Sequence, residues 1–323
     1  MYETSVRATN NTAAGITATG LGKRYGDLWA LRDVDLAVPP GSVLGLLGHN
    51  GAGKTTAIRI LTTLAQPTEG RASVAGHDVV TEAGAVRASI GVAGQAATVD
   101  GLLTAQANLE MLGRLNRLSK AQAKARATEL LERLGLGDVA GKRVDKFSGG
   151  MRRRVDLAAS LVSAPPVLVL DEPTTGLDPA SRNDLWALLR ELVADGMTLL
   201  LTTQYLEEAD QLADEIVVLD HGTVAAAGTP AELKSRIGGE RLEVTLADAA
   251  DAPAAERAVA PHADGAVAVE GVLLNVAVRP DLRLIEVVRA LDAAGVDAVD
   301  LTRRQPTLDD VFLTLTRKEA VPA

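Results

Sequence analysis

A glycine-rich segment at residues 48–56 places the strongest constraint on how this chain folds. It reads GHNGAGKTT and so contains the pattern G-x-x-x-x-G-K-[ST]. The short apolar run at residues 42–47 is typical of a buried strand, and residues 57–61 continue as the first turns of a helix. A strand, a glycine-rich loop and a helix start in this order predict a phosphate-binding loop.

The residues of this loop indicate its chemistry. Small side chains let successive backbone N–H groups converge on one anion, and the helix start adds a partial positive charge. Lys54 is expected to reach the β- and γ-phosphates of a nucleoside triphosphate, and the Thr55 hydroxyl to be a ligand of Mg²⁺. The predicted nucleotide-binding residues of the loop are Gly48, His49, Asn50, Gly51, Ala52, Gly53, Lys54, Thr55 and Thr56.

The composition indicates a folded, cysteine-free protein. With 323 residues, 47% of them hydrophobic and 23% charged, the chain has room for one large or two ordinary domains. Its 33 basic and 42 acidic residues give a net charge of −9, which disfavours nucleic acid as a partner. The absence of cysteine excludes disulfides and fits a reducing cytosol. The four histidines show no metal-ligand spacing, so none is assigned to a metal.

The sequence shows neither a membrane-spanning run nor a signal-peptide pattern. No run approaches the roughly 18 consecutive apolar residues that would cross a bilayer. Residues 1–14 have no apolar centre of the signal-peptide kind and are expected to be a flexible tail.

A second candidate site lies where an apolar run at residues 167–170 ends in Asp171 and Glu172. Acids at the C-terminal edge of a parallel strand lie where ligands bind in open α/β sheets. Asp171 is expected to hold Mg²⁺, directly or through water, and Glu172 to orient and deprotonate the attacking water. The alternative is a strand that simply meets solvent, which the phosphate loop upstream disfavours.

A third candidate comprises Ser148, Gly149 and Gly150, just before a predicted helix. Ser148 taken alone is an ordinary helix N-cap. The two glycines leave the backbone N–H groups open to a ligand, which indicates a second phosphate-facing surface.

Tyr25 lies at a predicted turn between two strands within residues 16–40. Its position is equally compatible with stacking on a purine ring and with an ordinary turn tyrosine.

The C-terminal part of the chain, beyond residues 238–239, has a different pattern. A final N-capped amphipathic helix is expected at residues 306–315. The order strand, helix, strand, strand, helix, strand predicts a small ferredoxin-like α/β module, with packing or dimerisation as its default role. The six elements are expected at residues 241–246, 253–259, 266–270, 272–278, 281–293 and 298–303.

Together these motifs closely resemble those of ABC-type ATPases, the nucleotide-binding subunits of membrane transporters, over residues 16–234. In that family's pattern, Gly48 to Thr55 falls at the Walker A loop and Tyr25 at the adenine-stacking aromatic. Gln95 falls at the Q-loop glutamine, which the resemblance implies contacts the metal and senses the membrane subunit.

The remaining family motifs match in order and spacing. Ser148, Gly149 and Gly150 match the signature motif, Asp171 and Glu172 match the Walker B pair, and Asp178 lies in the D-loop. In the family, ATP is sandwiched between the Walker A loop of one subunit and the signature loop of the other. The resemblance therefore implies a homodimer with two-fold symmetry.

One position departs from the common pattern, because the strand that should end in the switch histidine ends in Gln204. This residue and the C-terminal segment PTLDDVF are similar to daunorubicin-resistance-type ATPases, which work with a separate membrane subunit to export drugs or lipids from actinobacteria. A glutamine amide can donate a hydrogen bond to the γ-phosphate but does not titrate as an imidazole does. The hypothesis is that Glu172 alone serves as the base while Gln204 positions.

The resemblance implies a P-loop ATPase core of mixed α/β class with an antiparallel β subdomain. This ATPase domain would cover residues 15–236, with a helical subdomain at about 96–165, followed by an accessory α/β domain at 237–323. Its implied function is to bind and hydrolyse ATP, with Mg²⁺, and so energise a membrane exporter from the cytoplasmic face of the plasma membrane.

Two other functions stay open. A soluble ABC ATPase acting on DNA or ribosomes is disfavoured by the single Walker A loop, the short interval between Gln95 and Ser148, and the acidic balance. A nucleotide-binding regulator without hydrolysis is favoured by Gln204 but disfavoured by Glu172. The direction of transport, import or export, is not set by these motifs.

Overall fold

The computed structural model describes residues 15–94, 98–235, 240–279, 281–304 and 307–311. The predicted tail at residues 1–14 and Gln95 lie outside the described residues. The chain divides into two compact units, Met1–Thr229 and Pro230–Ala323.

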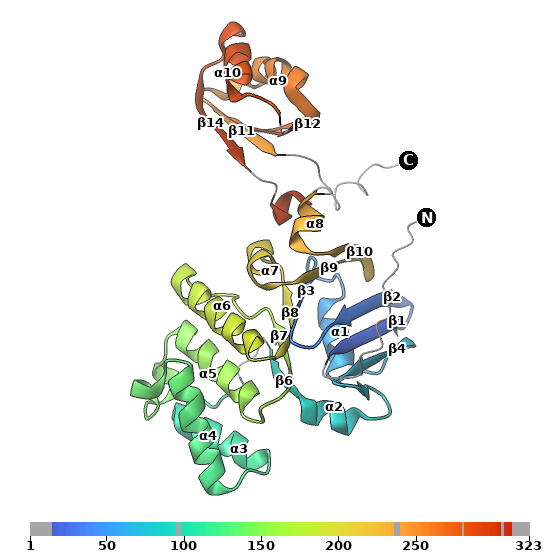
Figure 1. Cartoon of the computed structure of the whole chain (residues 1–323), viewed down its shortest axis with the longest axis vertical. Coiled ribbons are helices and arrows are strands. Elements are labelled where there is room, and N and C mark those ends of the chain that lie inside the picture. The colour runs from blue at the N-terminus through green and yellow to red at the C-terminus, as the bar shows by residue number, and fades with distance from the viewer. Residues whose placement is uncertain (1–14, 95–97, 236–239, 280, 305–306, 312–323) are drawn as a thin grey trace. The chain divides into compact units, whose positions relative to one another are not determined.

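The first unit is built on a six-stranded sheet with the order β10-β9-β3-β8-β7-β6 (Figure 1). Every residue of β3, β7 and β8 is buried, as expected for parallel strands covered on both faces. Strands β6, β7, β8, β3 and β9 pair in parallel, and β10 pairs with β9 as an antiparallel hairpin. Their bounds are β3 Val43–Leu47, β6 Ile90–Ala93, β7 Val167–Asp171, β8 Thr198–Thr203, β9 Glu215–Asp220 and β10 Thr223–Gly228.

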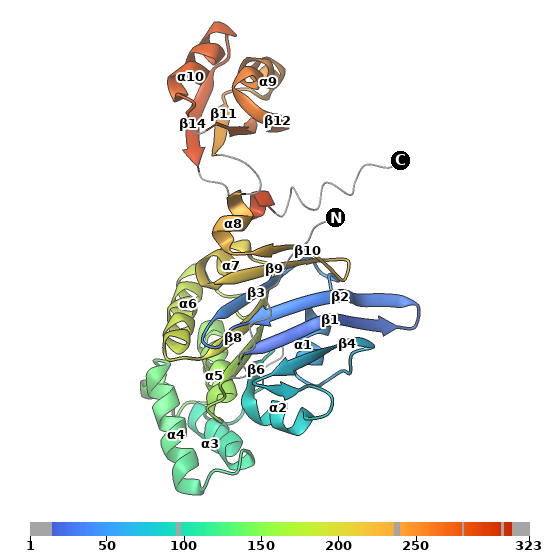
Figure 2. The same cartoon turned by 45° about the vertical axis from the view of Figure 1, so that its right-hand side comes forward.

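A second, antiparallel sheet with the order β2-β1-β4-β5 lies beside it (Figure 2). Helix α1 contacts strands of both sheets, and their apolar side chains share one core. Tyr25 pairs with Leu28 across the predicted turn. The bounds are β1 Ile16–Tyr25, β2 Leu28–Val38, α1 Lys54–Leu61, β4 Glu69–Val74, β5 His77–Asp78 and α2 Ala83–Ser89.

The helical subdomain expected at about residues 96–165 contains two separate helices between residues 105 and 133. Arg117 takes a left-handed φ of 67°, which ends the first helix, and Ser119 starts the second with a capping box to Gln122. Helices α3 and α4 lie together at the end of the unit away from the antiparallel sheet (Figures 1 and 2). The helices are α3 Ala105–Leu115, α4 Lys120–Arg133, α5 Gly149–Leu161, α6 Pro179–Ala194 and α7 Leu206–Leu212.

The second unit has the predicted ferredoxin-like order, with its own apolar core. Its antiparallel sheet has the order β12-β13-β11-β14, and α9 contacts α10. The bounds are α8 Pro230–Ser235, β11 Arg241–Leu246, α9 Ala252–Val259, β12 Ala263–Glu270, β13 Leu273–Val278, α10 Leu284–Ala293 and β14 Ala298–Arg304. Short 3-10 turns lie at Gly137–Val139, Val144–Lys146, Ala249–Asp251 and Ala260–His262. Among the described residues, no helix combines the length and the apolar character needed to span a membrane.

The second unit holds its last described segment by an ion-pair network. The Arg304 guanidinium, at the end of β14, donates to both oxygens of Asp310, at 2.7 and 3.2 Å, and to Glu243 Oε1 of β11. The Thr307 backbone N–H donates to Asp310 Oδ2 at 2.9 Å. Burial would raise the pKa of Asp310, but the hydrogen bonds from Arg304 and Thr307 outweigh it and hold the pKa below its usual range.

We expect Asp310→Asn to lower the stability of this segment by about 1–3 kcal/mol at pH 7, because the charge-assisted hydrogen bonds are lost. Because the pKa of Asp310 is lower in the folded state than in the unfolded state, its ionised carboxylate stabilises the fold at pH values above the unfolded-state pKa. This stabilisation is lost as the pH falls through the folded-state pKa. The difference between wild type and variant should therefore be largest near neutral pH and shrink as the pH falls below about 3.9, the usual pKa of an aspartate. Hydrogen exchange of peptides from β11 and β14 measures it. The exposed neighbour Asp309→Asn is the control, and an equal effect from it would contradict the role of Asp310.

Candidate functional site

The parallel pairing of β3, β8 and β7 brings the predicted site residues to one edge of the sheet. Leu47 of β3 lies opposite Thr203 of β8, and Thr202 lies opposite Asp171 of β7. Gly48, Gln204 and Glu172 directly follow these three strands. Segments far apart in the sequence therefore meet at the carboxyl edge, where open α/β sheets bind ligands.

The glycine-rich loop between β3 and α1 takes a backbone path that side chains at two positions would block. Gly48 and Gly53 have φ values of 155° and 109°, and a Cβ there would lie 2.5 Å from the Leu219 carbonyl oxygen and 2.6 Å from that of Ala30. The loop is thus packed against β9 and β2. Gly51, with φ 89°, has open space within 4 Å of the position that a Cβ would take, so an anion can approach the backbone there.

Lys54 begins α1 and its side chain folds back over the loop. Its ammonium group donates to the Gly48 carbonyl at 2.5 Å and to the His49 carbonyl at 3.1 Å, and the residue is only 6% exposed. Burial lowers the pKa of Lys54, while the charges of Glu172 and Asp171 oppose that shift. The lysine therefore lies in the electrostatic field of both acids that end β7.

The two acids differ in their surroundings. Asp171 is buried, and its Oδ1 accepts a hydrogen bond of 2.5 Å from the Thr202 hydroxyl. Glu172 has a left-handed φ of 50°, which is costly for a residue with a side chain, and its Oε2 accepts a hydrogen bond from the Thr175 hydroxyl at 3.2 Å. Strained backbone of this kind gathers at functional sites because the surrounding structure holds it in place.

Ser148 is the N-cap of α5, as predicted, with its hydroxyl accepting from the Met151 N–H at 3.2 Å. Gly149 has open space around it, whereas a Cβ on Gly150 would lie 2.6 Å from the Ser181 hydroxyl. That same hydroxyl donates to Asp178 Oδ2 at 2.6 Å, and Asp178 caps α6. These hydrogen bonds from Ser181 lower the pKa of Asp178. The signature and D-loop segments therefore meet at Ser181.

The other predicted residues lie as follows. Thr55 is exposed and Thr56 half-buried on the first turn of α1, while Ala52 is buried and Asn50 exposed in the loop. Gln204 is exposed just beyond β8. Tyr25 is 46% exposed, with the Lys23 ammonium 5.1 Å from the centre of its ring. His49 Nε2 lies 2.9 Å from Asp220 Oδ1 at the end of β9.

Arg153 is a residue of this site that sequence reasoning missed. From α5 it donates to the carbonyl oxygens of Pro173 and Gly94, both at 2.7 Å, and approaches that of Asp171 at 3.4 Å. Burial lowers the pKa of Arg153, against the charges of nearby acids. The guanidinium thus joins the helical region to the ends of β6 and β7.

Helical periodicity does not single out Arg153 among the three successive arginines. The residues four positions after Arg152, Arg153 and Arg154 are Asp156, Leu157 and Ala158, and all three are buried. Arg152 instead donates to the Asp145 carbonyl, and Arg154 pairs with Asp184 on the surface.

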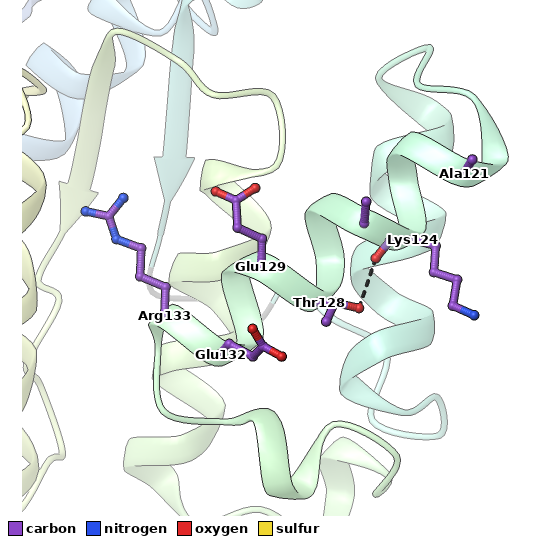
Figure 3. A pocket seen from close by; sticks show the side chains of 7 residues that line it. Ala121, Lys124, Thr128, Glu129, Glu132 and Arg133 are labelled. Atoms are coloured by element: carbon purple, nitrogen blue, oxygen red, sulfur yellow. Dashed lines mark hydrogen bonds between the residues drawn. The ribbon is translucent and has the colours of Figure 1, made fainter.

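A shallow depression of about 670 Å³ lies on α4 and contains none of these site residues (Figure 3). Small and charged side chains line it, and the Thr128 hydroxyl donates back to the Lys124 carbonyl. It is lined by Ala121, Lys124, Ala125, Thr128, Glu129, Glu132 and Arg133.

Sequence comparison finds relatives along nearly the whole chain. The ABC transporter family profile matches residues 31–175. The daunorubicin resistance ATP-binding protein DrrA3 of Streptomyces coeruleorubidus is 54% identical over 302 residues, which cover 93% of this chain and 95% of the relative. The daunorubicin/doxorubicin resistance ATP-binding protein DrrA of Streptomyces peucetius is 47% identical, covering 93% and 92%. The Nod factor export ATP-binding protein I of Ralstonia nicotianae is 39% identical and covers 94% of each chain.

Solved structures match about two thirds of the chain. The cbiO1 protein of Clostridium perfringens, part of the ABC transporter complex cbiONQ, has a TM-score of 0.64 at 28% identity and covers 70% of this chain and 93% of its own. The dimeric ATP-binding cassette MJ0796 in a post-hydrolysis state, bound to ADP and Pi, has a TM-score of 0.60 at 27% identity and covers 66% and 98%. The fold class predicted from the sequence is confirmed.

We expect Arg153→Met to destabilise the first unit by about 2–4 kcal/mol, because buried carbonyl groups lose their charged donor. Arg152→Met, one residue away on the surface, should change stability by less than about 0.5 kcal/mol. Both tryptophans, Trp29 and Trp186, lie in this unit, so chemical denaturation followed by their fluorescence reports on it. Equal losses in the two variants would show that Arg153 does not join the helical region to the sheet edge.

Proposed function

Because the chain belongs to the family of ABC transporter ATP-binding proteins, and is therefore an ATPase, we propose that the site at the sheet edge is one half of a shared ATP site. The observation that carries this proposal is the parallel pairing of β3, β8 and β7, which brings the glycine-rich loop, Asp171 and Glu172 to one edge, while Ser148 and Gly149 present a separate exposed helix start. In this proposal two copies of the chain drive a membrane subunit that exports a drug or a lipid.

The nucleotide phosphates would be held by residues 48–56. Gly48 and Gly53, where a Cβ would collide with neighbouring carbonyl oxygens, allow the loop backbone to follow its observed path. Gly51 leaves the backbone N–H groups accessible to the phosphates. The Lys54 ammonium, which donates to two loop carbonyls, would exchange these partners for β- and γ-phosphate oxygens. The exposed ring of Tyr25 would stack on the adenine.

Residues with oxygen ligands suited to Mg²⁺ lie in the same site. Thr55 offers an exposed hydroxyl, and Asp171 offers a carboxylate that the Thr202 hydroxyl orients. Gln95, which lies outside the described residues, would be the third. When bound, Mg²⁺ neutralises charge on the β- and γ-phosphate oxygens.

Glu172 would orient the attacking water and accept its proton. The left-handed backbone conformation of Glu172 ends the extended course of β7, and the Thr175 hydroxyl donates a hydrogen bond that orients the carboxylate. The amide of Gln204 would donate a hydrogen bond to the γ-phosphate, because it follows the neighbouring strand β8 at the same edge.

The homodimer is proposed because one chain offers only half of each interaction. Ser148 and Gly149 are exposed at the start of a 13-residue helix and would face the ATP bound by the second copy. Asp178, joined to Gly150 through Ser181, would lie at the same interface. The dimeric ATP-binding cassette with ADP and Pi supports this arrangement.

The export of a drug or lipid is proposed from the named relatives, which include daunorubicin resistance and Nod factor export ATP-binding proteins. The motor would lie at the cytoplasmic face of the plasma membrane, bound to separate membrane subunits. The accessory domain at residues 237–323 would contribute packing or dimerisation.

Glu172→Gln should leave ATP binding intact and lower steady-state turnover by about 10²–10⁴-fold, because the amide cannot accept the proton. Phosphate release measures turnover, and a fluorescent nucleotide measures binding. Glu207→Gln, which removes an exposed carboxylate of α7, is the matched control and should change turnover less than about twofold. Undiminished turnover in Glu172→Gln would refute its role as the base. Wild-type turnover no higher than that of Lys54→Ala would instead favour the non-hydrolysing regulator.

Gln204→His should change turnover by less than about tenfold, a difference of about 1.4 kcal/mol in the barrier. Both side chains can donate a hydrogen bond to the γ-phosphate, and Glu172 remains the base. The same phosphate-release measurement tests this, with Gln204→Ala as the variant that lacks a donor. A much larger change on introducing histidine would show that a titrating group, and not positioning alone, acts at this place.

A further inference from the structure

We propose that His49, Asp220 and His221 form a binding site for a divalent transition-metal ion, with Zn²⁺ as the best fit. One ligand atom from each residue lies within 4.8 Å of the others. His49 comes from the glycine-rich loop, Asp220 ends β9, and His221 begins the turn to β10. The ion would thus bind beside the nucleotide site and apart from the oxygen ligands proposed for Mg²⁺.

The backbone holds these residues in place. Asp220 pairs with Thr223, so His221 and Gly222 form a two-residue turn with φ values of 43° and 82°. The Gly222 N–H donates to the Ala52 carbonyl of the glycine-rich loop at 3.1 Å, and its carbonyl accepts from Arg32 at 2.8 Å. The turn and the loop are therefore fixed to each other before any ion binds.

The hydrogen bond of His49 prepares its ring as a ligand. Nδ1 lies 2.7 Å from the Asn50 carbonyl oxygen, which can only accept, so Nδ1 carries the proton. In the neutral ring Nε2 then has a free lone pair, 2.9 Å from the carboxylate oxygen Asp220 Oδ1, which is also an acceptor. Two acceptor atoms this close repel each other, and a cation bound by both would turn the repulsion into attraction. Metal-bound histidines commonly donate their other N–H to a backbone carbonyl in this way.

The second imidazole completes three ligands around Asp220 Oδ1. His221 Nε2 lies 3.9 Å from that oxygen, and the two imidazole centres are 5.1 Å apart. Bonds of about 2.0–2.1 Å in a tetrahedral site place ligand atoms about 3.4 Å apart. The observed 2.9 and 3.9 Å lie on either side of this value. The His221 side chain is 77% exposed, so it can rotate to close the site.

The ligand set indicates which ions fit. Two imidazole nitrogens and one carboxylate oxygen suit Zn²⁺, Co²⁺ or Ni²⁺, and they leave a fourth position for water. Mg²⁺ and Ca²⁺ prefer oxygen ligands alone. A bound Zn²⁺ would tie the glycine-rich loop to the β9–β10 turn, which should raise the Tm of the first unit by about 5 °C at roughly one hundred times Kd.

The test is a Zn²⁺ titration of the untagged full-length chain by calorimetry. We expect one strong site per chain, with affinity reduced at least about tenfold in His221→Asn. Asparagine tolerates the left-handed backbone of this turn, so the fold should persist. His262→Asn, in the second unit, is the matched control and should bind as wild type does. Circular dichroism checks the fold, and Asp220→Asn is the second variant should His221→Asn fail to fold.

Co²⁺ gives a spectroscopic signature of the same site. The wild type should show the visible absorption of four-coordinate Co²⁺ with nitrogen ligands, and His221→Asn should lose it. Equal Zn²⁺ affinity in wild type and His221→Asn, or no strong site in the wild type, would overturn the proposal.

Discussion

The parallel pairing of β3 with β8, and of β8 with β7, is the constraint on which the rest of the site depends. Because the three strands end at matching positions, the glycine-rich loop, the acids after β7 and Gln204 emerge at one edge. Every residue of these strands is buried, so a shift along the strand direction would draw a polar residue of the edge, such as Asp171, into the apolar interior. The position of the site is thus set by the packing of the sheet, and its functional groups lie at or just beyond the carboxyl ends of the strands.

Polar contacts then connect this edge to its neighbours. Arg153 holds α5 to the ends of β6 and β7, and Ser181 lies between Gly150 and Asp178. These contacts connect the start of α5 to the D-loop and to the segments that follow β6 and β7. In an ATPase that closes on a second copy, such links would transmit the state of the nucleotide site to the helical region.

The second unit is stabilised by its own means. A separate apolar core lies between its sheet and α9 and α10, and Arg304 joins β14 to β11 and to Asp310. Asp310 of the segment PTLDDVF is thus paired with a guanidinium that also contacts Glu243 of β11.

The sequence by itself determined the local features: the loop between strand and helix, the acids ending a buried strand, the Ser148 cap and the ferredoxin-like order. Each depends on neighbours within a few residues, and periodicity or turn chemistry reports them directly. The sequence predicted a helical subdomain at about residues 96–165 but not where α3 ends, which the left-handed Arg117 decides. Only the tertiary structure decided the direction of Arg153 and the meeting of His49 with Asp220, which lie 171 residues apart. Such contacts arise from the packing of distant segments, and spacing along the chain carries no signal of them.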